Sequence, residues 1–543
     1  MKRVLGIDLG TTNSCAAYVQ HGIPRVIPTE KGYNTLPSVV HFGASGKNTF
    51  GQAAKEQIVL HPKNTLYSTK RLLGRRFDSK AVQELIGFFS FEVVEGSNGL
   101  VEIQIGVDRV SPTAVAALLL EQLKAYAEAH IGECVTDAVI CVPAYFSDVQ
   151  RNAVKEAAKL AGLNVLRLCN EPTAASLAYG VNRSLQQRVL VYDLGGGTFD
   201  VSILELDQNM FEVVATGGDN FLGGADFDNR IIAWALEAFK AREDIDLSQD
   251  PITLQRLRGA AELAKCELSL LMNTELRLPY VAEKRGKQVD LELTLSRDVL
   301  NQLCADLLAR TISVTNSVLA NRGLDVKDIN EVILVGGMTR MPAVQAELSR
   351  LFTKPPKKGV HPDEVVALGA ALLGDSLDQI DSVTLLDVLS VPIGVAAGGG
   401  KIMRIFGQNQ SLPATQSMTL PTARDDQTRM EIDFFQGDSE SVDDADYLGT
   451  LVFDGIPIRK AGEVKVKVDI ELDAEGLVKI SAQDTIRNVR QGLTLQSMGL
   501  PASLRGRVRE KVGEVQDPAG QGTSPLPNEK GLRSLVRGIL GMK

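Results

Sequence analysis

The sequence predicts an α/β region with a duplicated core, followed by an all-β antiparallel sandwich and a short helical tail. Three observations support this division. Short apolar strands alternate with glycine-rich turns and amphipathic helices over residues 1–380. An Asp-Leu-Gly motif follows two of these strands. From about Lys401 onward, apolar residues recur with a period of two, which is typical of antiparallel strands with one buried face.

Composition and charge exclude several classes of protein. The formal net charge is −9, whereas nucleic-acid phosphates require a concentrated basic surface. The six cysteines include no CxxC pair and the five histidines form no HExxH motif, which argues against a zinc site and for a reducing compartment. Asp8 interrupts the apolar stretch of a signal peptide, and no apolar run approaches the ~18 residues of a membrane span. We therefore expect a cytoplasmic protein that binds no nucleic acid and has no transmembrane segment.

Individual strands can be placed in both regions. In the first, residues 1–380, the clearest are four short apolar segments, Val4–Ile7, Ala138–Val142, Val189–Tyr192 and Val332–Val335. In the second, residues 391–500, apolar and polar residues alternate over 430–434 and 464–470. A DAEG turn at 473–476 joins the latter stretch to another strand, 477–482. The second region is therefore expected to be a compact antiparallel unit.

Residues 381–390 link the two regions and are unusually apolar for a linker, with Val383, Leu385, Leu386 and Val388. Two interpretations are open. The segment is either the first strand of the sandwich, or a segment that docks on another surface in one state and is exposed in another.

The C-terminal region, residues 501–543, begins with a single helical face and continues into a loop, PAGQGTSPLP, that has no means of packing. The last residues carry apolar side chains at the spacing of an amphipathic helix, flanked by basic residues: Leu532, Leu535, Val536, Ile539 and Leu540. We expect this helix to fold against the sandwich, a partner or an anionic membrane surface, with a frayed, functionless end as the alternative.

The repeated motif indicates a phosphate site. DLGTTNSC (8–15) and DLGGGTFD (193–200) each place an aspartate at the end of an apolar strand, before a tight Gly/Thr turn. Such turns present backbone N–H groups and hydroxyls to phosphate oxygens, and their small residues allow close approach. Asp8 and Asp193 would supply hard oxygens for a hydrated Mg²⁺ ion. The repeat predicts two similar halves that face each other across a nucleotide cleft.

A third glycine turn, ILVGGMTRMP (333–342), also follows an apolar strand. Gly336 and Gly337 would allow a base to lie against the backbone, with Arg340 stacked over it. An ordinary strand-to-helix turn is the alternative.

Together the motifs resemble those of a known family. GIDLGTTNSC, NTLYSTKRLLGRRF, VPAYFSD, NEPTAA, YDLGGGTFD, LGGADFDNR and ILVGGMTRMP look like the signatures of the DnaK-type, seventy-kilodalton heat-shock chaperones, in order and over roughly residues 2–500. The resemblance implies an actin-like (ribonuclease-H-like, duplicated) ATPase domain over 1–380, a linker over 381–390 and a peptide-binding sandwich over 391–500. It implies a stress-response chaperone that binds extended apolar segments of unfolded proteins and controls their affinity by ATP hydrolysis.

The resemblance also implies the roles of individual residues around ATP or ADP, Mg²⁺ and K⁺. Lys70 would act on the γ-phosphate and attacking water, and Thr198 would contact the γ-phosphate. The Mg²⁺ shell would be held, mostly through water, by Asp8, Glu171 and Asp193. The phosphates would be bound by Gly10, Thr11, Thr12, Asn13, Gly195, Gly196 and Gly197. The adenosine end would consist of Glu262, Lys265 and Ser269 on one helix face, with Gly336, Gly337, Arg340 and Asp363.

Two further sets of residues follow from the resemblance. Communication between the domains and binding of a J-domain co-chaperone would involve Pro143, Arg151, Arg167, Leu385, Leu386 and Asp387. A nucleotide exchange factor is a further expected partner. The peptide pocket would be lined by Val395, Leu420, Met430 and Ile432, under an arch with Ala423 on one side. The other side would be Gly398, which is too small to clamp a peptide.

Several departures and alternatives accompany this interpretation. Cys266 replaces an arginine of some relatives, from which we expect a looser hold on the base. Region 501–543 is too short for the helical lid of relatives, so we expect a truncated lid and fast peptide release. A metabolic kinase of the same superfold is disfavoured by the β unit and the missing sugar-site insertion. An ATP-binding adaptor that docks a partner or membrane through its amphipathic tail is the main alternative, and a specialty in iron–sulfur assembly is another.

Overall fold

The computed structural model describes residues 3–44, 46–180, 186–357, 361–377, 383–397, 400–484, 486 and 490–494. Within these ranges, no helix is long and apolar enough to cross a membrane. The predicted tail over 501–543 and the predicted arch residue Gly398 lie outside the described residues.

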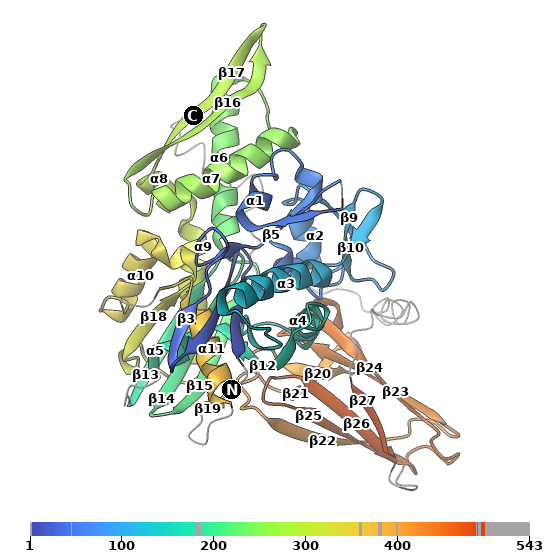
Figure 1. Cartoon of the computed structure of the whole chain (residues 1–543). Coiled ribbons are helices and arrows are strands. Elements are labelled where there is room, and N and C mark those ends of the chain that lie inside the picture. The colour runs from blue at the N-terminus through green and yellow to red at the C-terminus, as the bar shows by residue number, and fades with distance from the viewer. Residues whose placement is uncertain are drawn as a thin grey trace.

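Two mixed sheets form the core of the α/β region (Figure 1). Their strand orders are β12-β11-β1-β2-β3, with β4 beside β2, and β18-β13-β14-β15-β19. In each sheet, three consecutive antiparallel strands (β1–β3 or β13–β15) are joined by a parallel strand from later in the sequence, β11 or β18. This shared topology confirms the duplicated, actin-like core.

The strand bounds agree with the apolar segments. The first sheet contains β1 (Val4–Asp8), β2 (Asn13–Gln20), β3 (Ile23–Val26), β4 (Leu36–Pro37), β11 (Asp137–Val142) and β12 (Asn164–Asn170). The second contains β13 (Gln186–Leu194), β14 (Phe199–Asp207), β15 (Met210–Asp219), β18 (Glu331–Val335) and β19 (Thr384–Leu386). The four segments named above are therefore β1, β11, β13 and β18.

Helices cover and separate the two sheets. Between them lie α5 (Glu171–Gly180) and α11 (Val365–Ser376), whose buried residues form one cluster with residues of β11, β13 and β18. Further helices pack on the outer faces: α3 (Pro112–Ile131), α4 (Asp148–Leu160), α9 (Ala305–Ala320) and α10 (Pro342–Phe352). Helix α8 (Arg297–Leu303) instead contacts α6, α9 and β17. The central helices bring the carboxyl ends of both sheets toward one region.

Each half carries an additional subdomain on the same side as these strand ends (Figure 1). The first half adds α1 (Gly51–Lys55), α2 (Lys80–Ile86) and the sheets of β5 (Val39–Phe42), β6 (Asn48–Phe50), β7 (Thr65–Tyr67) and of β8 (Glu92–Glu95), β9 (Val101–Ile105), β10 (Asp108–Val110). The second half adds α6 (Gly224–Glu243), α7 (Pro251–Glu267) and the hairpin of β16 (Asn273–Lys284) and β17 (Lys287–Ser296). A deep cavity lies between the two halves.

The second region is a β-sandwich of two four-stranded antiparallel sheets, β21-β20-β23-β24 and β22-β25-β26-β27. The bounds are β20 (Ile393–Ala396), β21 (Ile402–Phe406), β22 (Ala414–Pro421), β23 (Arg429–Gln436), β24 (Asp446–Asp454), β25 (Lys465–Leu472), β26 (Val478–Asp484) and β27 (Arg490–Thr494). Val464, Val466, Val468 and Ile470 are fully buried between the sheets. The period of two therefore predicted the buried face of β25 correctly.

The segment between the two regions lies on the α/β side. Strand β19 pairs in parallel with β15, with Leu385 opposite Phe211, and so forms the outermost strand of the second α/β sheet. Leu385 is half-buried against the central cluster, whereas Leu386 is 37% exposed. The alternation along this short strand separates a packed side chain from an exposed one.

The sandwich contacts the first half of the α/β region along α4 and β12. The backbone N–H of Asp148 donates to Gln436 Oε1 (2.9 Å), and the Asp148 carboxylate accepts from the N–H of Val478 (2.9 Å). Glu475 accepts from the N–H of Leu168 (3.2 Å) and forms an ion pair with Lys155. The two regions are therefore docked through directional contacts that leave backbone groups satisfied.

We expect this docking to strengthen as the pH falls. Burial raises the pKa of Asp148 from 3.8 to about 6, although the bond from Val478 and the charge of Arg151 oppose the shift; Asp473 adds to it. Separation of the domains would expose the carboxyl and return its pKa toward the ordinary value. The docked form therefore binds the proton more tightly, and its population relative to the separated form should rise about tenfold from pH 7 to pH 5.

Energy transfer between a donor on the α/β region and an acceptor on the sandwich would measure this equilibrium. The additional population of the docked form should disappear as the pH rises through about 6. Asp148→Asn is the matched control, because its amide oxygen can still accept from Val478 but does not titrate. An unchanged pH dependence in that variant would assign the effect to another group.

Candidate functional site

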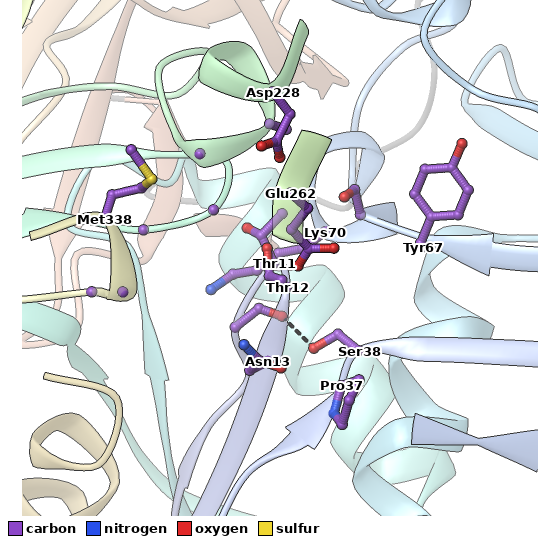
Figure 2. Close-up of a pocket in the computed structure, with 18 of the residues that line it drawn as sticks. Thr11, Thr12, Asn13, Pro37, Ser38, Tyr67, Lys70, Asp228, Glu262 and Met338 are labelled. Atoms are coloured by element: carbon purple, nitrogen blue, oxygen red, sulfur yellow. Dashed lines mark hydrogen bonds between the residues drawn. The ribbon is translucent and has the colours of Figure 1, made fainter. Parts of the chain in front are cut away.

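A cavity of about 450 Å³ lies between the two halves, and both Asp-Leu-Gly turns line it. The first turn connects β1 to β2 and the second connects β13 to β14. Figure 2 shows Thr11, Thr12 and Asn13 at the base of this cavity, with Lys70 and Glu262 above them. The hydroxyl of Ser38 donates to the carbonyl of Gly10 (2.7 Å), which fixes the first turn in place.

The two turns approach each other so closely that the residue types are constrained. A Cβ atom on Gly196 would lie 1.8 Å from Thr12 Oγ1, far inside contact distance. A side chain at position 196 would therefore separate the halves. Glycine here allows the backbone N–H groups and hydroxyls of the two turns to face one small volume, which is the arrangement that a polyphosphate requires.

Lys70 and Glu171 form a buried ion pair at the edge of the phosphate turns. Lys70 belongs to the 3₁₀ helix η2 (Thr69–Leu72), and Glu171 is the first residue of α5, directly after β12. Lys70 Nζ and Glu171 Oε1 are 2.7 Å apart, with side chains that are 7% and 9% exposed. The carboxylate therefore holds the ammonium in one position at the cavity wall.

At the phosphate end of the cavity, the ammonium of Lys70 lies among several carboxylates. Burial, followed by the charge of Glu171, raises the pKa of Asp8 to about 7 and that of Asp200 to about 8, and the same causes raise the pKa of Asp193 well above its usual range. Burial opposes the charge of Lys70, but the carboxylates, led by Glu171, outweigh it and raise the pKa of Lys70. A single ammonium therefore does not balance these carboxylates, and a cation would be favoured there.

The carboxylates at the phosphate end could hold the waters of a hydrated ion. Among the described residues, no three His, Cys, Asp or Glu side chains are close enough together to hold a metal. Mg²⁺ usually keeps several of its waters, and Asp8, Glu171 and Asp193 all line the cavity where such waters would lie.

The far end of the cavity is built from α6, α7, η4 (Gly337–Arg340) and the residues before α11. Lys265 Nζ lies 2.8 Å from Asp228 Oδ1 and donates to the carbonyl of Gly224 (2.9 Å). Arg340 pairs with Asp363 at 2.7 Å. These pairs fix the polar side chains around a pocket to which the thioether of Met338 contributes an apolar wall.

One ion pair crosses the cavity between its two upper subdomains. Lys55, the last residue of α1, lies 2.7 Å from Glu262 of α7. Nearby, the hydroxyl of Ser90 donates to Gln255 Oε1 (2.5 Å), also across the opening. The halves are thus connected above the cavity as well as below it.

Most of the predicted nucleotide residues line this one cavity: Asp8, Gly10, Thr11, Thr12, Asn13, Lys70, Glu171, Asp193, Gly195, Gly196, Thr198, Glu262, Lys265, Gly336, Gly337, Arg340 and Asp363. Gly197 does not line it, because it packs against Thr11 and Arg71. Ser269 is also absent, and its predicted place on the helix face was wrong. Helix α7 ends at Glu267, so Ser269 lies in the following turn.

Several lining residues were not predicted, namely Pro37, Ser38, Lys55, Tyr67, Asp228, Gln255, Arg258 and Met338. Asp228 lies within the quoted stretch LGGADFDNR, so its position after a glycine pair was the available signal. Cys266 lies at the cavity rim and is exposed, whereas Cys15 is buried.

A chain of hydrogen bonds connects the cavity to the linker. Asn170, which directly precedes Glu171, accepts from Arg151 Nη2 (2.7 Å) and donates to Asp387 Oδ2 (2.8 Å). Thr173 also donates to that Asp387 oxygen (3.3 Å). Arg151 further donates to the carbonyls of Ala144 and Phe146, just after Pro143. Burial raises the pKa of Asp387 and lowers that of Arg151.

Other predicted interdomain residues lie around this series of hydrogen bonds. Arg167 lines a small cavity of about 20 Å³ together with Arg151, Asp387 and Leu385. Pro143 is buried at the end of β11. The structure therefore places the predicted interdomain residues together, except that Leu386 points to solvent.

Most of the predicted peptide-binding residues lie in the core of the sandwich rather than at a cavity. Val395, Met430 and Ile432 are buried in the sandwich cluster, and Leu420 packs against it. Ala423 is exposed, and its N–H donates to Gln427 Oε1 (2.8 Å). In the docked arrangement, the three buried side chains act as core residues.

A comparison with protein families finds one family model that matches the chain. Its description is Hsp70 protein, and the match extends over residues 4–513.

Proposed function

Because this chain belongs to the Hsp70 family of chaperones, whose members are ATPases, we propose that it binds extended apolar segments of unfolded polypeptides and that ATP hydrolysis controls their affinity. The observation that carries the proposal is the continuous contact from Lys70 and Glu171 through Asn170 to Asp387 of the linker. A movement of Lys70 or Glu171 at the phosphate site would be transmitted to Asp387 through Asn170, which directly precedes Glu171 in the sequence.

In the proposed reaction, the residues of this chain bind and orient the nucleotide. The two turns donate N–H groups to the phosphates, and Lys70, held by Glu171, places a positive charge where negative charge accumulates during phosphoryl transfer. Mg²⁺ would neutralise phosphate charge, with Asp8, Asp193 and Glu171 holding its waters. Lys265, Glu262 and Arg340 line the end where adenosine would bind. A bound K⁺ stays a prediction from the resemblance.

Peptide binding is proposed for the sandwich, by addition of an extended segment to a sheet edge. Val395, Met430 and Ile432 are no more than 8% exposed when the sandwich is docked. The proposal therefore requires that undocking make these side chains accessible. Docking and peptide affinity would then be coupled through one conformational equilibrium.

The linker strand provides the test. Leu385→Asp should weaken docking at least about tenfold, because its half-buried side chain packs against the central cluster and a carboxylate there loses hydration. Stimulation of ATP turnover by a model unfolded peptide should be lost with it. Leu386→Asp is the matched control on the same strand, where the side chain is exposed. Equal loss in both variants, or full stimulation in Leu385→Asp, would contradict the proposed route.

A J-domain co-chaperone and a nucleotide exchange factor are proposed as partners on the basis of family membership. No observation on the described residues favours the alternative of an adaptor that acts through its C-terminal tail.

A further inference from the structure

The cavity between the two halves extends beyond its phosphate and adenosine ends. Figure 2 shows Tyr67 on one side of Lys70 and Met338 of the adenosine end on the other. On the Tyr67 side, large apolar side chains of the first half form the wall. We call this part of the cavity the aromatic compartment and define it by Val59, Tyr67, Leu85, Phe88 and Phe89. None of these residues belongs to the Gly/Thr turns or to the set assigned to adenosine.

The wall of the aromatic compartment is partly rigid and partly open. Phe89 stacks on Phe91, with ring centroids 4.7 Å apart, and Tyr67 meets Phe91 edge-on at 5.5 Å. These contacts fix one side of the wall. Phe88 is 43% exposed and Val59 is 38% exposed, although both line a cavity. A ligand that covered these two side chains would remove apolar surface from water, which favours binding.

The opposite wall is one face of helix α7 in the second half. Gln255, Arg258 and Glu262 lie three and four residues apart, so they share a helix face, and all three line the cavity. Arg258 donates to the Tyr67 hydroxyl, and its guanidinium carbon lies 5.5 Å from the centroid of the Tyr67 ring. The cation therefore lies directly beside the apolar wall.

The charge of Arg258 is not matched by a carboxylate of the protein. Glu262, on the same helix face, is paired with Lys55 at 2.7 Å. Among the described residues, no carboxylate oxygen lies within 4 Å of the Arg258 guanidinium, whose printed contacts are the hydroxyl and the ring of Tyr67. A guanidinium binds planar anions with two parallel hydrogen bonds and also stacks on aromatic rings. The compartment thus combines an apolar wall with a site for an anionic group.

The aromatic compartment is complete only when the two halves are close together. Ser90 Oγ of the first half donates to Gln255 Oε1 of the second half (2.5 Å), and the Tyr67 hydroxyl donates to the same oxygen (3.4 Å). A ligand between Phe88 and Arg258 would contact both halves. It would therefore bind the closed cavity more tightly than an open one, and would favour closure by the same free energy.

We propose that the aromatic compartment is a second ligand site, which binds a flat aromatic anion. Its ring lies against Phe88 and Val59, and its carboxylate or sulfonate pairs with Arg258. Because this ligand contacts both halves, it slows the release of a nucleotide from the same cavity, and a bound nucleotide raises the affinity for the anion by the same factor. The coupling rests on the proposed nucleotide binding, whereas the site itself does not.

Two fluorescent probes with the same rings test the site on the full chain. One is 1-anilinonaphthalene-8-sulfonate, and the other is its uncharged analogue N-phenyl-1-naphthylamine. Arg258→Gln removes the charge and keeps an N–H donor. It should lower the affinity for the sulfonate about tenfold or more, as expected for loss of a charge-assisted hydrogen bond, and change that for the uncharged probe less than twofold. Equal effects on both probes, or none, would overturn the proposal.

A pair of apolar variants locates the rings of the probes. Phe88→Ala should lower the affinity for both probes at least about fivefold, because it removes the exposed part of the wall. Leu270→Ala is the matched control, since Leu270 is 87% exposed and does not line the cavity. It should leave both affinities unchanged. Parent-like binding by Phe88→Ala would place the probes elsewhere and overturn the proposal, and thermal unfolding shows that each variant is folded.

Mg²⁺ and ADP separate the aromatic compartment from the phosphate end, which could also accept a sulfonate. Added Mg²⁺ and ADP should raise the affinity for the sulfonate probe, whereas displacement of the probe would assign it to the phosphate end and overturn the proposal. Release of a red-fluorescent ADP analogue should be at least about threefold slower with saturating probe, and unaffected by the probe in Arg258→Gln. Unchanged release would overturn the coupling. Failure of ADP to bind at all would instead contradict the proposed function.

Discussion

Replacement of Lys70 by alanine is expected to lower single-turnover ATP hydrolysis by about 10²–10³-fold, the usual cost of removing a preorganised charge that acts on the transition state. Lys70 is 8% exposed and is held at 2.7 Å by Glu171, so its charge is fixed before the reaction begins. Binding of ATP should be largely retained, because residues of both Gly/Thr turns line the same cavity. Rapid-quench measurement with enzyme in excess separates the chemical step from product release.

Lys55→Ala is the matched control for this prediction. Lys55 also lines the cavity and pairs with a carboxylate at 2.7 Å, but its side chain is 37% exposed and it lies above the phosphate turns. Its loss should change nucleotide dissociation more than the chemical step. Near-normal single-turnover hydrolysis in Lys70→Ala would contradict the role proposed for Lys70.

Replacement of Gly336 by alanine is expected to lower nucleotide affinity by about 100-fold, or about 2.7 kcal/mol. Gly336 has φ +81° and ψ 144°, a region that is essentially restricted to glycine and costs other residues about 1–3 kcal/mol. A Cβ atom would also lie 2.3 Å from the carbonyl oxygen of Leu194 and 2.8 Å from Asp193 Oδ1. The backbone must therefore move at the point where the proposed adenosine end meets the second phosphate turn.

Gly337→Ala provides the neighbouring control, since its nearest contact would be Asp363 Oδ1 at 3.2 Å and its φ is not positive. We expect an affinity loss below about tenfold for this variant. Titration with a fluorescent ATP analogue gives both values, and thermal unfolding shows that each variant is folded. Parent-like binding by Gly336→Ala would mean that the close approach to Leu194 is not required.

The residues that line the cavity between the two halves were predictable because their signals are local. An aspartate at the end of an apolar strand, followed by Gly and Thr, specifies both a tight turn and its chemistry, and the motif occurs twice. The strand positions followed from runs of apolar residues, as in β1 and β13. The placement of Ser269 on the helix face was wrong for a local reason as well. The prediction continued the helical spacing past Glu267, where α7 ends.

Contacts between distant residues gave no comparable signal. The bonds from Asp148 to Gln436 and Val478 join residues that are far apart in the sequence and lie in no recognisable motif. The contact between Tyr67 and Arg258 depends on the approach of the two halves, which no motif in the sequence specifies. The linker was expected to be either the first strand of the sandwich or a segment that docks in one state and is exposed in another, and its pairing with β15 depends on the arrangement of the sheets.

The length of strand β19 limits how much the pairing of the linker can contribute to holding the two regions together. It has three residues and pairs with a neighbour on one side only. A hydrogen bond contributes about 0.5–1.5 kcal/mol to stability, so the pairing is worth a few kcal/mol. A ligand needs a preference of about 5.5 kcal/mol to reverse a 1:99 population completely. The pairing of the linker strand would therefore add less to the docked arrangement than the preference that one ligand needs to reverse such a population.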